Sequence, residues 1–232
     1  RPAPYIYLAG DIGLGEGSRG LYDHLVQRLP QTDWGVLTFH YLQPDVDWHN
    51  RVLFAIGEMR RRPLLIADAG YMYAAKMSGM AEAYDLFTPD AGELAFLADD
   101  LAPHPFYTRG FILHEEQKVS DLIARAYRYK NAARILLVKG QVDYVAGAQG
   151  AFATIDSPDE EALEPIGGTG DTLTGIVSAL AAGGMEMGRA AALAARANRI
   201  AGCWKRPKPP ASAMPTTGPP SEPLLHDRQK TG

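Results

Sequence analysis

The stretch 164–184, EPIGGTGDTLTGIVSALAAGG, places glycines, threonines and one aspartate directly before an apolar helix. Gly167, Gly168 and Gly170 have no Cβ, so their backbone N–H groups can turn inward together. The start of the following helix adds the positive end of its dipole. This loop, which also contains Thr169, is therefore predicted to bind an anion such as a phosphate.

Asp171 follows these glycines in the first turn of the expected helix. An aspartate at that position could be only a helix cap. A cap does not need three glycines in front of it, however, and a carboxylate beside an anion site can take the proton from a hydroxyl that attacks a bound phosphoryl group. We therefore expect Asp171 to act as a general base. The loop is not a Walker sequence, because no lysine follows its glycines.

A second glycine-rich stretch, GEGSRG at 15–20, fits the dinucleotide-binding pattern, with a strand expected before it and a helix after it. That pattern also needs an acid near the end of the second strand, and here the strand ends TFHYLQP with no acid until Asp45. A nicotinamide dehydrogenase is one alternative. A second alternative is a plain strand-to-helix turn. A third is a loop in which Ser18 and the backbone N–H groups help to cover a substrate.

Short apolar runs alternate with amphipathic stretches along the chain, which is typical of a mainly parallel sheet covered by helices. Strands are expected at 5–10, 34–42, 63–70, 84–90 and 134–140, followed by an antiparallel edge hairpin at 143–156. Helices are expected at 21–29, 48–61, 91–99, 118–129, 171–184 and 188–204. The sequence thus predicts an α/β fold.

The bulk composition narrows the classes of protein. With 232 residues, of which 46% are hydrophobic, we expect one domain over 1–204 and a Pro-rich, extended or partly disordered tail over 205–232. The net charge of -4 offers no general attraction to nucleic acid or anionic membranes. Cys203 is the only cysteine, which excludes an intramolecular disulfide and favours the cytoplasm. No apolar run approaches the roughly 20 residues that span a bilayer.

Several segments resemble the ribokinase-like superfamily, and within it the NAD(P)H-hydrate dehydratase branch. GGTGDTLTGIVSAL is very similar to that branch's Gly-Gly-(Ser/Thr)-Gly-Asp-x-Leu-(Thr/Ser)-Gly signature. LLVKGQVDYVAGAQG resembles the strand that ends in Lys-Gly, where the nucleotide lies, and LFTPDAGELAFL resembles the Thr-Pro-His-Pro-Gly-Glu segment, which approaches the substrate. LLIADAG resembles the strand ending in Asp-Ala-Asp. The resemblance covers about 60–204.

The resemblance implies a three-layer α/β/α fold and an enzyme that uses ATP or ADP with Mg²⁺. The nucleotide would phosphorylate the hydroxyl of a hydrated NAD(P)H, and phosphate would then leave. Asp171 would be the base, and the loop with Gly170 would hold the transferring phosphate. The expected nucleotide contacts are Lys139, Gly140, Gln141, Val142, Asp143 and Asn198. The expected substrate contacts are Asp68, Asp90, Gly92 and Glu93, with no metal ligand among the side chains.

The chain departs from the family pattern mainly on the substrate side. Asp90-Ala91 replaces His-Pro, and Asp143 stands where threonine is usual. An acid close to nucleotide phosphates would repel them unless Mg²⁺ or Lys139 intervenes. A small-molecule kinase that stops at the phosphorylated product, and a nucleotide-binding regulator without turnover, therefore stay open as alternatives. A homo-oligomer is expected.

Each candidate also has a plainer interpretation. Lys139 could simply extend to solvent, Glu93 could stabilise its helix dipole, and Asp68 could be a cap or turn acid. Asn198 could be a solvent-facing amide. The six histidines show no metal-ligand spacing, so we expect them to be surface or core residues.

Overall fold

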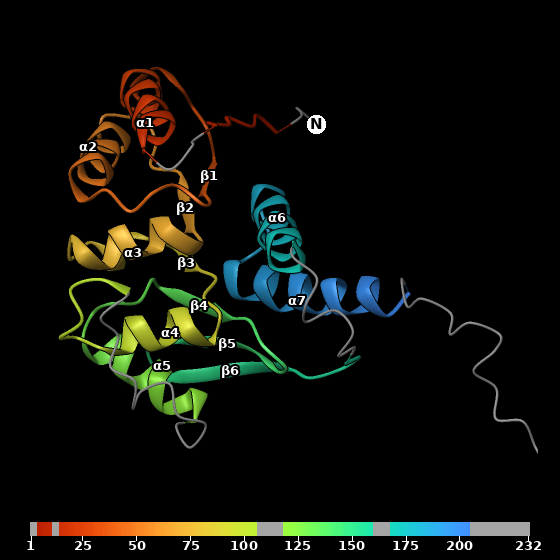
Figure 1. Ribbon diagram of the computed structural model, residues 1–232. Helices are drawn as coiled ribbons and strands as arrows, with labels where there is room; N and C mark the ends of the chain where they lie inside the picture. Colours follow the sequence, from red (N-terminus) through yellow and green to blue (C-terminus); the bar gives the residue numbers. More distant parts are fainter. Residues whose placement is uncertain (1–3, 11–13, 106–117, 160–167, 205–232) are drawn as a thin grey trace, which may run out of the picture.

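The computed structural model describes residues 4–10, 14–105, 118–159 and 168–204. Within these residues, six strands form one sheet in the order β1-β2-β3-β4-β5-β6 (Figure 1). The strands are β1 (Val36–Phe39), β2 (Leu64–Ala67), β3 (Leu86–Phe87), β4 (Ile135–Val138), β5 (Asp143–Gly147) and β6 (Gly150–Ile155). The first four pair in parallel, while β5 pairs antiparallel with both β4 and β6. The predicted edge hairpin is therefore present.

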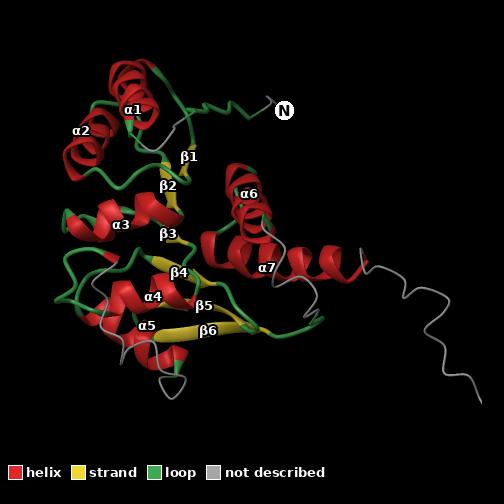
Figure 2. Ribbon diagram, viewed as in Figure 1, coloured by secondary structure: helices red, strands yellow, loops and turns green. Residues whose placement is uncertain are grey.

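Helices cover both faces of this sheet (Figure 2). One layer contains α1 (Glu16–Arg28), α2 (Val46–Gly57), α3 (Ala69–Met77), α4 (Ala91–Ala98) and α5 (Val119–Arg128). The other layer contains α6 (Thr169–Ala182) and α7 (Met187–Trp204). None of the helices in the described ranges is long and apolar enough to cross a membrane. The arrangement is the three-layer α/β/α fold that the sequence predicts.

The central strands supply the core on both sides of the sheet. In β2, Leu65 and Ala67 pack into the core under α1–α5, while Ile66 packs under α6 and α7. In β4, Leu136 lies in the first core and Leu137 in the second. Successive strand side chains point to opposite faces, so a strand covered on both sides must be apolar throughout. This explains why β2 and β4 are continuous apolar runs.

The prediction of a strand at 5–10 is wrong. Residues 4–10 form no ladder with β1, and Tyr5 and Leu8 are 75% and 88% exposed. The rings of Tyr5 and Tyr7 instead lie near that of Trp34, at centroid distances of 6.2 and 5.8 Å. An apolar run shows that a segment could be buried, but a strand also needs a neighbour to pair with.

The segment after β2 also differs from expectation, because it forms helix α3. The chain leaves the sheet at Asp68, which caps this helix by accepting a hydrogen bond from the Ala69 backbone N–H. The helix α6 begins at Thr169, two residues earlier than expected. The tail 205–232 lies outside the described residues.

Candidate active site

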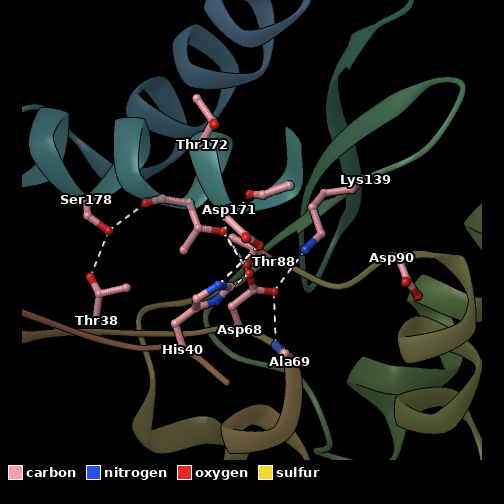
Figure 3. Close-up of polar contacts among 12 residues, drawn as sticks. Thr38, His40, Asp68, Ala69, Thr88, Asp90, Lys139, Asp171, Thr172 and Ser178 are labelled. Atoms are coloured by element: carbon pink, nitrogen blue, oxygen red, sulfur yellow. Dashed lines mark hydrogen bonds and ion pairs between the residues drawn. The ribbon is translucent and has the colours of Figure 1, made fainter. Parts of the chain in front are cut away.

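The four parallel strands end at the same edge of the sheet, and a polar residue stands at or just beyond each end. His40 follows β1, Asp68 follows β2, Thr88 follows β3 and Lys139 follows β4. Open α/β sheets bind their ligands at this carboxyl edge. The first turn of α6, which contains Asp171, lies over the same edge (Figure 3). Segments far apart in the sequence thus meet in one group of side chains.

Asp68 is the centre of this group and is only 1% exposed. Its Oδ1 accepts hydrogen bonds from Lys139 Nζ at 2.9 Å and from the Ala69 N–H at 3.0 Å. Its Oδ2 accepts one from Thr174 Oγ1 at 2.9 Å and lies 3.0 Å from Nδ1 of His40. Burial by itself would raise the pKa of Asp68, but these side-chain partners hold the pKa below its ordinary value. Asp68 is therefore a buried, ionised carboxylate as well as a helix cap.

His40 joins Asp68 to Asp171. Its Nε2 lies 3.1 Å from Oδ1 of Asp171, so one ring nitrogen faces each carboxylate (Figure 3). The contact with Asp68 raises the pKa of His40 and outweighs burial, which lowers it. The sequence prediction of a surface or core histidine missed this role. The available signal was its place near the carboxyl end of an expected strand, at the edge where ligands bind.

The backbone is strained beside two of these residues. Tyr41, directly after His40, has a φ of 51°, and Ala69, directly after Asp68, has a φ of 48°. Non-glycine residues held in this region cost about 1–3 kcal/mol each and cluster at functional sites. At the next position, a Cβ on Gly70 would collide with the carbonyl oxygen of Leu42. The loop after β1 therefore lies directly on the start of α3, which brings His40 to Asp68.

The start of α6 has the features of an anion site. Gly168 is the N-cap with a φ of 94°, and no described side chain caps the helix. Gly170 and Asp171 lie in the first turn, where backbone N–H groups have no acceptor within the helix. A Cβ on Gly170 would lie 3.5 Å from Nζ of Lys139, so the lysine is directly beside this turn. Gly167 lies outside the described residues.

The ammonium group of Lys139 lies beside the start of α6 and does not extend into solvent. Its side chain is 18% exposed. Burial by itself would lower the pKa of Lys139, but the carboxylates of Asp68 and Glu93 outweigh burial and raise it. The ammonium group and the start of α6 therefore form one electropositive position beside the Asp171 carboxylate.

The turn between β4 and β5, where nucleotide contacts are expected, is held by an ion pair. Asp143 is buried, and its Oδ2 accepts a hydrogen bond from Arg199 Nε at 2.7 Å. Its Oδ1 accepts one from the Gly140 N–H at 3.1 Å. Arg199 Nη2 also donates to the carbonyl oxygens of Gly140 and Gln141, at 2.9 and 2.8 Å. Arg199 is therefore the side chain that neutralises Asp143 in this structure.

Sequence reasoning missed Arg199 and named its neighbour. Asn198 is half-buried on α7. The sequence gives no reason to single out Arg199, because an arginine on a helix is ordinary and its partner Asp143 is 56 residues away in the chain. The unusual Asp143 was the signal that a cation had to be found. Val142 lies in the same turn, directly before β5.

The residues expected to contact the substrate begin helix α4. Asp90 and Glu93 form a capping box, in which each side chain accepts a hydrogen bond from the other's backbone N–H at 2.8 Å. Tyr73 OH also donates to Glu93 Oε1 at 3.2 Å. Burial and the charge of Asp90 raise the pKa of Glu93 to about 7. Gly92 is exposed in the same turn. Glu93 therefore has a structural role at the start of α4, as its plainer interpretation predicts. This role does not exclude a contact with substrate.

One group of described side chains could offer three ligands to a metal ion. Atoms of His40, Asp68 and Asp171 all lie within 4.8 Å of one another. Mg²⁺ prefers oxygen ligands, and an imidazole is poorly suited to it. Lys139 already neutralises Asp68 at 2.9 Å. The donor set therefore does not fit a resident Mg²⁺, and the group is better described as a network of two carboxylates and two cationic side chains.

The glycine stretch 15–20 lacks the surroundings of a dinucleotide site. Gly15 caps α1 with a φ of 76°, but residues 4–10 are not a strand. The residue after β1 is His40 rather than an acid, and Asp45 caps α2 by accepting from the Trp48 N–H. An open hollow of about 400 Å³ lies beside this stretch, and none of the strand-end residues lines it. The described residues before this stretch, 4–10 and Leu14, form no strand, so they do not support the plain strand-to-helix turn either.

The fold and the strand-end site define a ribokinase-like protein. Phosphofructokinase-2 of Escherichia coli, solved with fructose-6-phosphate, superposes with a TM-score of 0.54 at 14% identity, over 84% of this chain and 59% of that one. A pyridoxal kinase of Lactobacillus plantarum superposes with a TM-score of 0.55 at 15% identity, over 81% of this chain and 69% of that one. The chain thus spans less than two thirds of the phosphofructokinase.

Within that class, the sequence profile of the NAD(P)H-hydrate dehydratase family matches residues 44–217, and the chain belongs to this family. An uncharacterised protein of Methanocaldococcus jannaschii is 40% identical over 198 residues, which cover 85% of this chain and 80% of the relative. The predicted superfamily and fold are confirmed. The family match indicates a carbohydrate-kinase-like enzyme.

Proposed function

We propose that the protein is an ATP- or ADP-dependent NAD(P)H-hydrate dehydratase-like enzyme. It would phosphorylate the hydroxyl of a hydrated nicotinamide ring and eliminate phosphate to restore NADH or NADPH. The observation that carries this proposal is the place of Asp171. Its side chain is 46% exposed in the first turn of a glycine-capped helix, and the partly buried Lys139 lies beside this turn.

In the phosphoryl transfer, the substrate hydroxyl oxygen attacks the terminal phosphorus of the nucleotide. The bond to the leaving nucleotide oxygen breaks, and the hydroxyl proton passes to the Asp171 carboxylate. Charge on the transferring phosphoryl group is stabilised by the N–H groups at the start of α6 and by Lys139. In the second step the carbon–oxygen bond of the phosphate ester breaks, phosphate leaves, and the ring loses a proton as its double bond forms.

The nucleotide would lie against the turn 139–142 and the neighbouring face of α7, near Asn198. Hydrogen bonds from Arg199 to Asp143 and to the carbonyl oxygen of Gly140, and from the Gly140 N–H to Asp143, hold the backbone of this turn. We expect Mg²⁺ to arrive on the nucleotide phosphates, whose charge it offsets, because the protein side chains alone do not suit it. Asp90, Gly92 and Glu93 would border the substrate at the start of α4.

A small-molecule kinase is the second candidate function. Asp90 caps α4 at the position where the family pattern has histidine, so the acceptor side carries an additional acid. Such a site could hold a different alcohol, which would keep its phosphate. A nucleotide-binding regulator without turnover is a third.

The assay that separates these functions uses purified protein with Mg²⁺, either ATP or ADP, and hydrated NADH. Release of phosphate together with the return of the absorbance of reduced nicotinamide is expected for the dehydratase. Nucleotide cleavage only with another alcohol, such as a sugar or a pyridoxal-like acceptor, would point to the kinase. Nucleotide binding without consumption of any acceptor would contradict both enzymes and leave the regulator.

A further inference from the structure

The ring of His40 is held between two carboxylates of different character. Asp68, on one side, is buried and accepts hydrogen bonds from Lys139, Thr174 and its own helix, which hold it in place. Asp171, on the other side, is half-exposed and stands at the start of α6. Both ring nitrogens are shielded from solvent, although the side chain as a whole is 29% exposed. The histidine therefore connects a fixed anion to an accessible one.

The contact with Asp68 contributes most to the raised pKa of His40, and the charges of Asp68 and Asp171 add to it. The ring nitrogens lie 3.0 and 3.1 Å from the two carboxylate oxygens, but without hydrogen-bond geometry. Two opposite charges within about 4–6 Å favour the charged form of an imidazole. The positive charge of Lys139, which directly follows β4, opposes the charged form of His40. The ring of Tyr41, whose centroid lies 4.2 Å from that of His40, is a neutral neighbour. The balance favours a cationic His40.

The two oxygens of Asp171 have different surroundings. Oδ1 is the oxygen that contacts His40. Oδ2 faces the glycine that caps the helix, since a Cβ on Gly168 would lie 4.0 Å from it. One oxygen thus contacts His40, while the other lies near Gly168 at the helix start, where a phosphate is expected to bind.

We propose that His40, as a cation, is a positioning residue for Asp171: it ties one carboxylate oxygen to the buried Asp68 and leaves the other to take the substrate proton. This inference rests on the proposed role of Asp171 as the base. The nearby backbone strain at Tyr41 and Ala69 is consistent with a geometry maintained for this purpose.

The proposal predicts a dependence on alkaline pH. The groups that face His40 are Asp68 at the start of α3, Asp171 on α6, Lys139 after β4 and Tyr41 on its own segment. Because the pKa of His40 is raised, the cation persists at neutral pH and is lost as the pH rises through that value. Asp171 is then released, and kcat should fall on the alkaline side of the profile.

The first test needs no substrate. The histidine ring signals of the full chain are followed by NMR as the pH is changed, and His40 is expected to titrate above the ordinary value of about 6.5. Asp171→Asn should lower the titration midpoint of His40, whereas Asp121→Asn, at the same position of α5, should not. An ordinary midpoint that does not respond to Asp171→Asn would overturn the proposal. Asp171 is half-exposed, so this variant should fold.

The second test is kinetic and uses His40→Gln, which keeps a polar group but cannot carry a charge. We expect kcat to fall about 10- to 100-fold with the nucleotide KM within about twofold, and the alkaline limb of the profile to disappear. His24→Gln, an exposed histidine on α1, is the matched control. Unchanged kcat and pH profile in His40→Gln would overturn the proposal. If Asp171→Asn itself keeps full activity, the proposed base fails, while the NMR titration still decides whether His40 holds Asp171.

Discussion

Asp171 and Asp121 occupy the same position in two helices, the first turns of α6 and α5. Their surroundings differ, because Asp171 contacts His40 and stands beside the glycine cap and Lys139, while Asp121 is exposed at the surface. A carboxylate in the first turn of a helix is ordinary by itself. The chemistry expected of Asp171 therefore comes from its neighbours.

Replacing the base should remove turnover and spare nucleotide binding. Asp171→Asn keeps the size of the side chain but cannot accept a proton at neutral pH, so kcat should fall about 10²- to 10⁴-fold. Nucleotide affinity, measured by calorimetry, should change by no more than about twofold. Asp121→Asn should leave both quantities unchanged. A rate for Asp171→Asn equal to that of the unchanged chain would show that another group takes the proton.

Arg199 should matter for both stability and nucleotide binding. Its side chain is 10% exposed and pairs with the buried Asp143, so Arg199→Ala leaves an uncompensated buried carboxylate, at a cost of about 3–5 kcal/mol in the free energy of unfolding. The turn 139–142 would also lose two carbonyl contacts, and the nucleotide KM should rise.

Arg196→Ala, an exposed arginine on the same helix, is the control for this prediction. Removing both charges, in Asp143→Asn with Arg199→Gln, should recover most of the lost stability. Denaturant unfolding and nucleotide titrations measure the two effects. Equal stability of Arg199→Ala and Arg196→Ala would argue against a buried, energetically coupled pair.

At the scale of elements, the residue that caps α6, Gly168, has a backbone conformation that favours glycine. The φ of 94° at Gly168 lies in a region that L residues rarely adopt. Gly168→Ala should therefore destabilise the protein by about 1–3 kcal/mol and lower kcat, because the helix start that faces the phosphate would shift. Circular dichroism melting and the activity assay measure both.

Gly175→Ala is the matched control, since Gly175 lies inside the same helix and a Cβ there would meet nothing within 4 Å. An alanine in a helix interior is about 0.5–1 kcal/mol more favourable than glycine, so this variant should be slightly more stable. If both variants behaved alike, the backbone conformation at Gly168 would not be the reason for its glycine.

At the scale of the whole molecule, the free energy of unfolding should fall in mild acid because His49, which is not one of the strand-end residues, is buried. His49 is fully buried, and Tyr84 OH lies 2.8 Å from its Nε2. Burial lowers the pKa of His49 to about 4, so the unfolded chain binds a proton between about pH 6.5 and 4 that the folded chain does not. Stability should fall by about 3 kcal/mol over this range.

Melting temperatures measured between these pH values check the prediction. His49→Gln should remove most of this pH dependence, while His24→Gln, at an exposed position, should keep it. A slope that survives in His49→Gln would assign the acid sensitivity to other groups.

Most of the fold could be predicted from the sequence, because its signals are local. The apolar runs of β2 and β4 reflect burial on both faces, and the turn between β5 and β6 reflects its Ala-Gln-Gly sequence. The strand expected at 5–10 failed because whether an apolar segment pairs depends on a neighbour elsewhere in the chain. Helix α3, which begins directly after Asp68, was not expected from the sequence.

The sequence by itself determined the chemistry available at the start of α6. Conformational freedom at Gly168, the dipole of the helix and the carboxylate of Asp171 are properties of adjacent residues, so one short stretch contains them all. The same holds for the strand that ends in Lys139. These are the parts of the proposed site for which the sequence alone supplies candidates.

Only the tertiary structure decided which charges meet. His40 reaches Asp68 and Asp171 because β1 and β2 are parallel neighbours and α6 begins over their common edge. Arg199 reaches Asp143 because α7 packs against β5. No spacing in the sequence encodes such pairs, since they depend on the order of strands in the sheet. The strength of an electrostatic interaction depends on the distance between the two charges in space. The number of residues between them in the sequence does not give that distance.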